Sequence, residues 1–187
     1  MIILETHRLI LRRLLPSDLA SLFALYSDPE VRRYFPEGTL TCEETREELD
    51  WFLGGHPDNP HLGLWATIRR ETNQFIRRCG LLPWLIDGRP EVEAAYMLAK
   101  EHWGHGLGTE AAHGILRYGF ERLQLARLIC LIDRDNQASI KVAMKIGMTF
   151  EKEGMDDKGP YLLYARNRPP ERGANQAGQP SRPDGSE

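Results

Sequence analysis

Hydrophobic and polar positions follow a helical period in some segments of the chain and a strand period in others. Apolar side chains at the i, i+3, i+4 and i+7 spacing predict an amphipathic helix over residues 17–27. A second helix is predicted to begin at Thr41, because Glu44 three residues later completes a capping box, and to end before Gly54 and Gly55. Two further helices are predicted over residues 107–122 and 136–146, the latter closed by Gly147.

Short apolar runs bounded by turn residues predict the strands. These runs cover residues 8–14, 62–68, 75–86, 91–99, 127–132, 148–153 and 161–166, with a hairpin turn at 71–73 and a loop at 155–160. Strands interrupted by helices indicate an α/β layered domain with a mixed sheet over residues 1–166. From Asn167 onward the apolar side chains are alanines only, so residues 167–187 are predicted to be a disordered tail.

Composition narrows the class of protein but does not identify a partner. A chain of 187 residues with 41% hydrophobic content suits one domain with a real core. The net charge of -3 gives no general attraction to nucleic acid or to an anionic membrane. Three widely spaced cysteines and no long apolar run favour a reducing, cytoplasmic setting. The histidines show no metal-ligand spacing, so no metal is predicted.

A glycine-rich turn, residues 103–109, runs into the helix predicted from residue 107. Gly104, Gly106 and Gly108 let the backbone take positive φ and let a ligand approach closely. Because the first amides of a helix have no partner within it, the turn is predicted to bind an anion such as a pyrophosphate. Two alternatives are a tight connector with glycines for packing and a dinucleotide-binding turn, for which Asp133 and Asp135 follow at a suitable distance.

The turn and its surroundings resemble the GNAT N-acetyltransferase superfamily. Its acyl-coenzyme A signature is [Gln/Arg]-x-x-Gly-x-[Gly/Ala] between a strand and a helix, which residues 103–108 match except that Trp103 occupies the first position. Trp-Gly-x-Gly followed by Thr-Glu-Ala is similar to the ribosomal-protein alanine N-acetyltransferase branch. Residues 4–12, 65–68, 79–81, 93–96, 136–139, 145–148 and 163–166 resemble the same branch. The resemblance implies a mixed, mostly antiparallel central sheet flanked by helices.

The resemblance also implies direct transfer of an acetyl group from acetyl-CoA to a primary amine. Glu93 is the first candidate for the base or for holding the amine, with a solvated strand carboxylate as the alternative; Glu153 and Asp156 are second candidates. Ser139 resembles the residue of the ribosomal-protein branch that lies near the coenzyme sulfur and protonates the departing thiolate, with a helix-face hydroxyl as the alternative. Ala143 stands where many other members place a tyrosine acid. The residues expected to bind the coenzyme are Met97, Leu98, Trp103, Gly104, His105, Gly106, Leu107, Gly108, Thr109, Asn136 and Ser139.

The acceptor and the assembly are not fixed by the sequence. Peptide N-termini, polyamines and other small-molecule amines are the acceptors that the resemblance implies, and a homodimer is left open. Tyr34, Phe35 and Trp51 are candidates for contact with the acceptor or for burial against the sheet. Cys79 and Cys130 are predicted to pack as small apolar residues, and His105 to be a solvent-exposed loop residue. The unusual Trp103 and the absence of the tyrosine acid motivate a second hypothesis. The protein would then be an acyl-CoA-binding sensor or interaction module without transfer activity.

Overall fold

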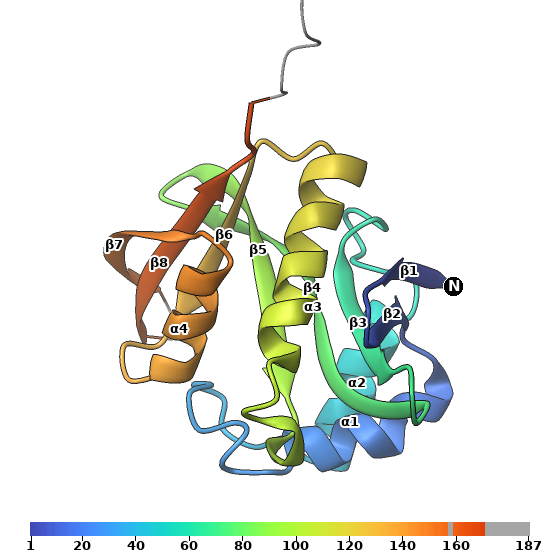
Figure 1. Ribbon diagram of the computed structural model, residues 1–187. Helices are drawn as coiled ribbons and strands as arrows, with labels where there is room; N and C mark the ends of the chain where they lie inside the picture. The colour runs from blue at the N-terminus through green and yellow to red at the C-terminus, as the bar shows by residue number, and fades with distance from the viewer. Residues whose placement is uncertain (157–158, 171–187) are drawn as a thin grey trace, which may run out of the picture.

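One mixed sheet runs through the whole domain. The computed structural model describes residues 1–156 and 159–170, and within them the strands form an eight-stranded sheet in the order β1-β2-β3-β4-β5-β6-β8-β7 (Figure 1). Every neighbouring pair is antiparallel except β5 and β6. The predicted mixed, mostly antiparallel sheet is confirmed.

In chain order the elements are β1 (Ile2–Glu5), β2 (Leu9–Arg13), η1 (Pro16–Asp18), α1 (Leu19–Tyr26), α2 (Cys42–Phe52), β3 (Gly63–Arg69), β4 (Gln74–Ile86), β5 (Arg89–Leu98), η2 (Lys100–His102), α3 (Leu107–Arg117), η3 (Tyr118–Arg122), β6 (Arg127–Ile132), α4 (Gln137–Lys145), β7 (Thr149–Asp156) and β8 (Gly159–Asn167).

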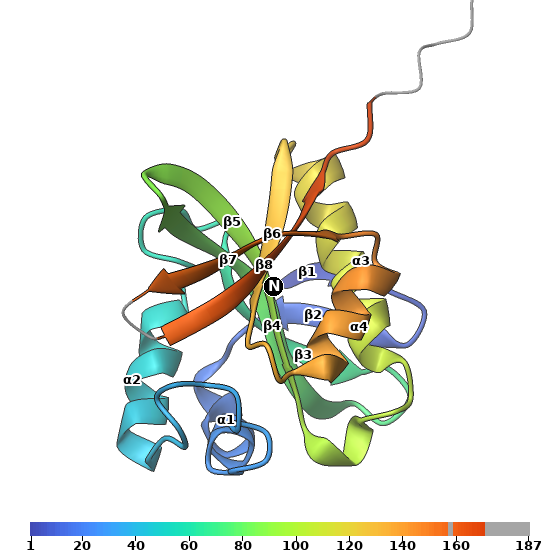
Figure 2. The ribbon, with the colours of Figure 1, turned by 90° about the vertical axis from the view of Figure 1, so that its left-hand side faces the viewer.

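Helices cover both faces of the sheet. Figure 2 shows α3 and α4 on one side and α1 and α2 on the other. The α3 side holds a buried core that includes Ile115 and Leu128, and the α1 side holds a second core that includes Leu22 and Leu64. Burial of such side chains supplies most of the stability of the domain. No helix of the described residues has the length and apolar character to cross a bilayer.

The predicted start of α2 and the predicted glycine after α4 are confirmed in atomic detail. Thr41 Oγ1 accepts from the Glu44 amide at 3.3 Å, and the Glu44 carboxylate accepts from the Thr41 amide at 2.7 Å, which is the reciprocal capping box. Gly147, which follows the C-cap residue Ile146 of α4, has a φ of 78°, in the left-handed region that commonly ends a helix.

Two details of the predicted strands are wrong. The edge strand β1 was not predicted, because its four residues are exposed, partly buried, partly buried and exposed and so lack the alternation of a half-buried strand. The predicted loop at 155–160 is too long, since β7 runs through Asp156 and β8 begins at Gly159. Gly154 makes this extension possible: a Cβ there would lie 2.3 Å from the ring of Tyr161, its partner across the hairpin.

The predicted disordered tail is tested only at its first residues. Asn167 belongs to β8, and the amide of Arg168 donates to Ala126 O at 2.8 Å, so the ordered chain extends just past the predicted boundary. The remainder of the predicted tail from residue 171 lies outside the described residues.

The sheet opens between its two parallel strands. β4 pairs with β5 along the whole of β5, but a single registered pair, Glu93 with Ile129, joins β5 to β6 in the described part of the chain. The two strands therefore diverge from that pair, and the edge of β5 that leads to the glycine turn faces an opening. This divergence positions the candidate site.

Candidate functional site

The glycine-rich turn presents an uncapped end of α3. Gly104 and Gly106 have φ values of 78° and 75°, in the left-handed region that favours glycine. Gly106 is the N-cap residue, and no side chain of the described residues caps this helix. Because the first amides of a helix lack partners inside it and the helix dipole is positive there, this end has the geometry and polarity that an anion requires.

Trp103 fixes the turn to the end of β5. Its indole Nε1 donates a hydrogen bond to Leu98 O at 2.8 Å, while 45% of the residue stays exposed. The short helix η2 separates β5 from the turn, so the strand does not lead straight into it. The unusual residue at the first position of the motif thus has a structural role. The Leu98 carbonyl, an expected contact of the pantetheine arm, retains a second lone pair.

The N-terminal segment holds the other side of the turn. Glu110, in the first turn of α3, accepts from Thr6 Oγ1 at 2.6 Å and from Arg8 N and Nε at 2.7 and 2.6 Å. Arg8 Nη1 donates to His105 O at 3.0 Å. The imidazole of His105 is exposed, as predicted. A partly exposed guanidinium therefore lies beside the glycine turn.

Removing the charge of Glu110 should weaken the fold in a pH-dependent way. Burial opposes ionisation of Glu110, but the hydrogen bonds from Thr6 and Arg8 outweigh it and hold its pKa below the ordinary 4.5. A carboxyl whose folded pKa is depressed stabilises the fold above its unfolded pKa, and this stabilisation is lost as pH falls through the folded pKa. Glu110→Gln should therefore lower the free energy of unfolding in urea by about 1–2 kcal/mol at neutral pH.

The same variant should approach the wild type as the medium is acidified below the ordinary glutamate pKa, because the wild type then loses the ionic hydrogen bonds too. Glu47→Gln is the matched control, since Glu47 is exposed on α2. It should follow the wild type at every pH. A Glu110→Gln deficit that is constant with pH would contradict the ionic role of this carboxylate.

Glu93 lies where β5 and β6 diverge. Its Oε2 accepts from Trp84 Nε1 at 2.7 Å, and its Oε1 lies 3.4 Å from the donating amide of Leu131 on β6. The side chain is partly buried and is positioned from both neighbouring strands, unlike a freely solvated strand carboxylate. Such fixed geometry is what a general base or an amine-binding group needs.

A cavity of about 460 Å³ opens beside Glu93. Its walls come from the loop after α1, from β4, β5 and β6, from the start of α4 and from the β7–β8 hairpin. Two predicted residues lie away from it: Glu153 is paired with Arg134 at 2.8 Å, and Trp51 is 60% exposed. The predicted residues that the cavity brings together are Glu93, Asn136, Ser139, Tyr34, Phe35 and Asp156.

The start of α4 is held from two sides. Asn136 Oδ1 accepts from the Ser139 amide at 3.1 Å as the N-cap, and Tyr96 Oη donates to Ser139 O at 3.1 Å. Burial raises the pKa of Tyr96, so its phenol stays protonated and remains a donor. Tyr96 thereby ties β5 to α4. Ala143, where a tyrosine acid is usual, is fully buried.

Comparison with known proteins decides the family. The family model described as the Acetyltransferase (GNAT) domain matches residues 8–149. The chain belongs to the GNAT acetyltransferase family. Two relatives come from Bacillus subtilis (strain 168). The uncharacterized protein YkkB is 37% identical over 164 residues, which cover 87% of this chain and 94% of YkkB. The uncharacterized N-acetyltransferase YoaA is 32% identical over 154 residues, which cover 82% of this chain and 85% of YoaA.

Solved structures share the fold of this GNAT acetyltransferase. RimL, a ribosomal L7/L12 alpha-N-protein acetyltransferase in complex with coenzyme A, has a TM-score of 0.74 at 19% identity, covering 89% of this chain and 98% of RimL. Spermidine N-acetyltransferase from Vibrio cholerae, in complex with CoA and spermine, has a TM-score of 0.72 at 17% identity, covering 87% of this chain and 97% of its own. At these identities the likeness shows the fold, and the predicted GNAT fold is confirmed.

Two buried arginines of the GNAT acetyltransferase were missed from the sequence. Arg32 and Arg78 are 4% and 6% exposed and line the cavity. Their guanidinium carbons lie over aromatic rings, Arg32 at 4.7 Å from the Phe35 centroid and Arg78 at 5.4 Å from the Tyr26 centroid. For Arg78 the available signal was the pair of consecutive arginines, Arg77 and Arg78, inside an otherwise apolar strand run; Arg32 lies in the loop after α1 and gave no comparable signal.

The two strand cysteines pack as predicted. Cys79 and Cys130 are buried, and Cys130 Sγ donates to Ala94 O at 3.2 Å. Burial raises the pKa of both thiols, so neither is present as a reactive thiolate. No three His, Cys, Asp or Glu side chains gather as a metal site in the part of the chain that the structure describes.

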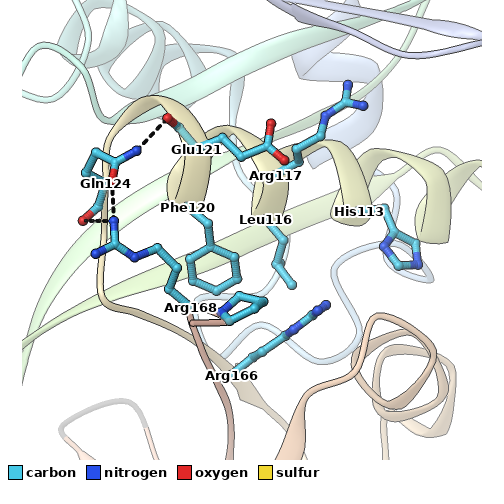
Figure 3. Close-up of a pocket in the computed structure, with 9 residues that line it drawn as sticks. His113, Leu116, Arg117, Phe120, Glu121, Gln124, Arg166 and Arg168 are labelled. Atoms are coloured by element: carbon cyan, nitrogen blue, oxygen red, sulfur yellow. Dashed lines mark hydrogen bonds between the residues drawn. The ribbon is translucent and has the colours of Figure 1, made fainter. Parts of the chain in front are cut away.

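A second cavity lies at the far end of α3. It measures about 470 Å³ and runs between this helix and the end of β8. Figure 3 shows Phe120 and Leu116 on the helix side of this cavity, with the side chains of Arg166 and Arg168 below them. Arg168 Nη1 donates to Gln124 O at 3.3 Å. This cavity contains none of the residues predicted for catalysis or coenzyme binding.

Proposed function

We propose that this GNAT acetyltransferase moves an acetyl group from acetyl-CoA to a primary amine by direct transfer. The observation that carries the proposal is that Glu93 and Ser139 line one cavity at the point where β5 and β6 diverge. A carboxylate and a hydroxyl in one partly enclosed space are the two proton-transfer groups that amide formation from a thioester needs.

The glycine turn fits the phosphates of acetyl-CoA, which family membership makes the cosubstrate. A Cβ placed on Gly106 would meet only Arg8 Nη2, at 3.6 Å, so the surface above the turn is open to a ligand. The backbone of β5 on the open side of the sheet suits the extended pantetheine arm, which would pair in the manner of an added strand. The residues assigned to the coenzyme are Met97, Leu98, Trp103, Gly104, His105, Gly106, Leu107, Gly108, Thr109, Asn136 and Ser139.

Proton transfers are the chemistry that this chain supplies. An amine is mostly protonated at neutral pH, with a reference pKa of about 8 for an α-amino group and about 10.4 for lysine. Glu93, directly or through a water, takes that proton. The nitrogen lone pair then forms the C–N bond at the thioester carbon as the C–S bond breaks. The nitrogen, which carries two protons after the attack, loses one of them to solvent as the amide forms. The Ser139 hydroxyl gives a proton to the departing thiolate and regains one from solvent, and Glu93 releases to solvent the proton that it took. No covalent bond to the enzyme is required.

Peptide N-termini and polyamines are the acceptor classes to test first. The solved neighbours include an enzyme for a ribosomal protein N-terminus and one for spermidine, both of the same fold. Tyr34 and Phe35 line the cavity beside Glu93, whose carboxylate offers a negative charge to a cationic acceptor. The site thus suits a primary amine, and the panel of acceptors has to include both classes.

Purified protein incubated with acetyl-CoA and this panel tests the proposal. Thiol release, with mass spectrometry of the acceptor, should show saturable, enzyme-dependent acetylation of at least one amine. A matched reaction with acetyl-CoA and no acceptor measures hydrolysis alone. Saturable binding of coenzyme A without turnover on any amine would instead favour a binding module, which the alanine in place of the tyrosine acid also suggests.

A further inference from the structure

A fully buried arginine lies beneath the glycine turn. Arg77 is 0% exposed and sits on the face of β4 that packs against α3. Its Nη1 donates to Leu107 O, at the first residue of α3, at 2.9 Å. Its Nε and Nη2 are buried and have no hydrogen-bond partner among the described residues. Two of the three guanidinium nitrogens are therefore unsatisfied in the protein without ligand.

No carboxylate compensates this charge. The ion pairs of the described residues do not include Arg77. The groups that interact with it are the Cys79 thiol and the Tyr96 ring, whose centroid is 5.7 Å from Cζ. Burial lowers the pKa of Arg77. A buried cation without a counterion is costly, so its presence calls for a compensating charge.

The position of Arg77 indicates where that compensating charge belongs. Its Nη1 lies 4.0 Å from the point that a Cβ on Gly108 would occupy, directly under the first turn of α3. The helix dipole already makes this end positive, so a cation here is unfavourable to the free protein. The two positive contributions become favourable together only when an anion occupies the turn.

We propose that Arg77 is a buried electrostatic residue of the coenzyme site, which strengthens binding of the diphosphate at the glycine turn without touching solvent. The proposal rests on the proposed function, because the diphosphate is that of acetyl-CoA. Arg77 acts through the turn that it supports, so it is a positioning residue and not a catalytic one. A purely structural role, tying Leu107 to β4, predicts a different pattern of binding.

Two ligands separate the electrostatic role from the structural one. Dephospho-CoA carries the diphosphate, whereas pantetheine carries the same thiol arm without it. For Arg77→Gln we expect the Kd for dephospho-CoA to rise about tenfold in calorimetry, which equals about 1.4 kcal/mol. We expect the Kd for pantetheine, measured by competition, to stay within about twofold. Arg77→Lys keeps the charge and should keep dephospho-CoA affinity within about threefold of the wild type.

Each other outcome decides against the proposal. Equal losses for both ligands, or the same loss in Arg77→Lys, would show that the shape of the side chain matters and not its charge. An unchanged Kd for dephospho-CoA in Arg77→Gln would also overturn it. If Arg77→Gln does not fold, Arg77→Met, of similar length and without polar atoms, gives the same comparison. Failure of both to fold would show that the free protein needs the charge, contrary to the proposal.

The wild type distinguishes this failure from failure of the proposed function. If wild-type protein binds neither coenzyme A nor dephospho-CoA, the proposed function falls and the role of Arg77 falls with it. The other case is that the wild type binds both ligands, while the ratio of the Kd values for dephospho-CoA and pantetheine is the same in wild type and in Arg77→Gln. In that case the proposed function stands, and only the inference about Arg77 is wrong.

Discussion

Gly106→Glu should abolish coenzyme A binding, with a rise in Kd of at least about 100-fold, or about 3 kcal/mol. Gly106 has a φ of 75° and forms the N-cap of α3, so its replacement strains the turn and puts a carboxylate where the phosphates are expected. A Cβ at this position meets only Arg8 Nη2, at 3.6 Å, so it fits the protein without ligand. We therefore expect the loss of affinity to come from steric and electrostatic conflict with the phosphates, in addition to the backbone strain. Titration calorimetry with coenzyme A measures it.

A matched variant separates strain from charge at the site. Gly88, in the turn between β4 and β5, has a φ of 74° and would also place a Cβ in open space. Gly88→Glu should lose similar stability in urea unfolding while binding coenzyme A with unchanged affinity. If Gly106→Glu retained wild-type affinity, the coenzyme would not lie on this turn, and the assignment of residues 103–109 would have to be abandoned.

Glu93→Gln should lower kcat by about 10²–10³-fold, because a positioned general base contributes of this order to proton transfer. The amide keeps the shape of the side chain but cannot take a proton. Coenzyme A affinity should stay within about threefold, since Glu93 lies in the cavity between β5 and β6 and not in the turn. Steady-state kinetics on the best amine of the panel, with calorimetry on coenzyme A, gives both quantities.

The kinetic pattern tells a base from an amine-binding group. A base matters less for an acceptor of low pKa, so the loss should be smaller with an α-amine than with a lysine-like amine. A higher KM with an unchanged kcat would show that Glu93 holds the amine instead. Glu91→Gln is the control: this residue is two positions earlier on β5 and pairs with Arg127 at 3.1 Å. Its kcat should remain within about threefold of wild type.

Most of the fold could be predicted because its signals are local. Helical spacing, the capping box at Thr41 and the glycine at the end of α4 each depend on residues within four positions of one another, and all were confirmed. The strands with alternating or continuous apolar runs were found for the same reason. The short exposed edge strand β1 was missed, because pairing with β2, and not its own pattern, makes it a strand.

The candidate site was predicted only where a motif carries it. The glycine spacing and the strand before it indicated the turn, and the family resemblance indicated Glu93 and Ser139. The supports of the site were not predicted, because they join distant parts of the chain. Arg8, just before β2, donates to the carbonyl of His105, and Tyr96 on β5 donates to the carbonyl of Ser139 on α4. Arg77 was not singled out from the sequence, and its burial depends on the packing of α3 over β4, which no local pattern specifies.

The sequence by itself determined that a helix begins at a glycine-rich turn, that a strand precedes it and that the chain belongs with the acetyltransferases of this type. The helix and the strand need only neighbouring residues, whose relative positions are fixed by the geometry of a helix or strand. The family resemblance needs the order of short motifs along the chain and no knowledge of how they pack. The tertiary structure decided that β6 leaves β5 after one registered pair, that Glu93 accepts from Trp84, and that Arg77 is buried with two nitrogens that have no hydrogen-bond partner among the described residues. Strand order and helix packing set these contacts, because they bring together side chains that no local spacing relates.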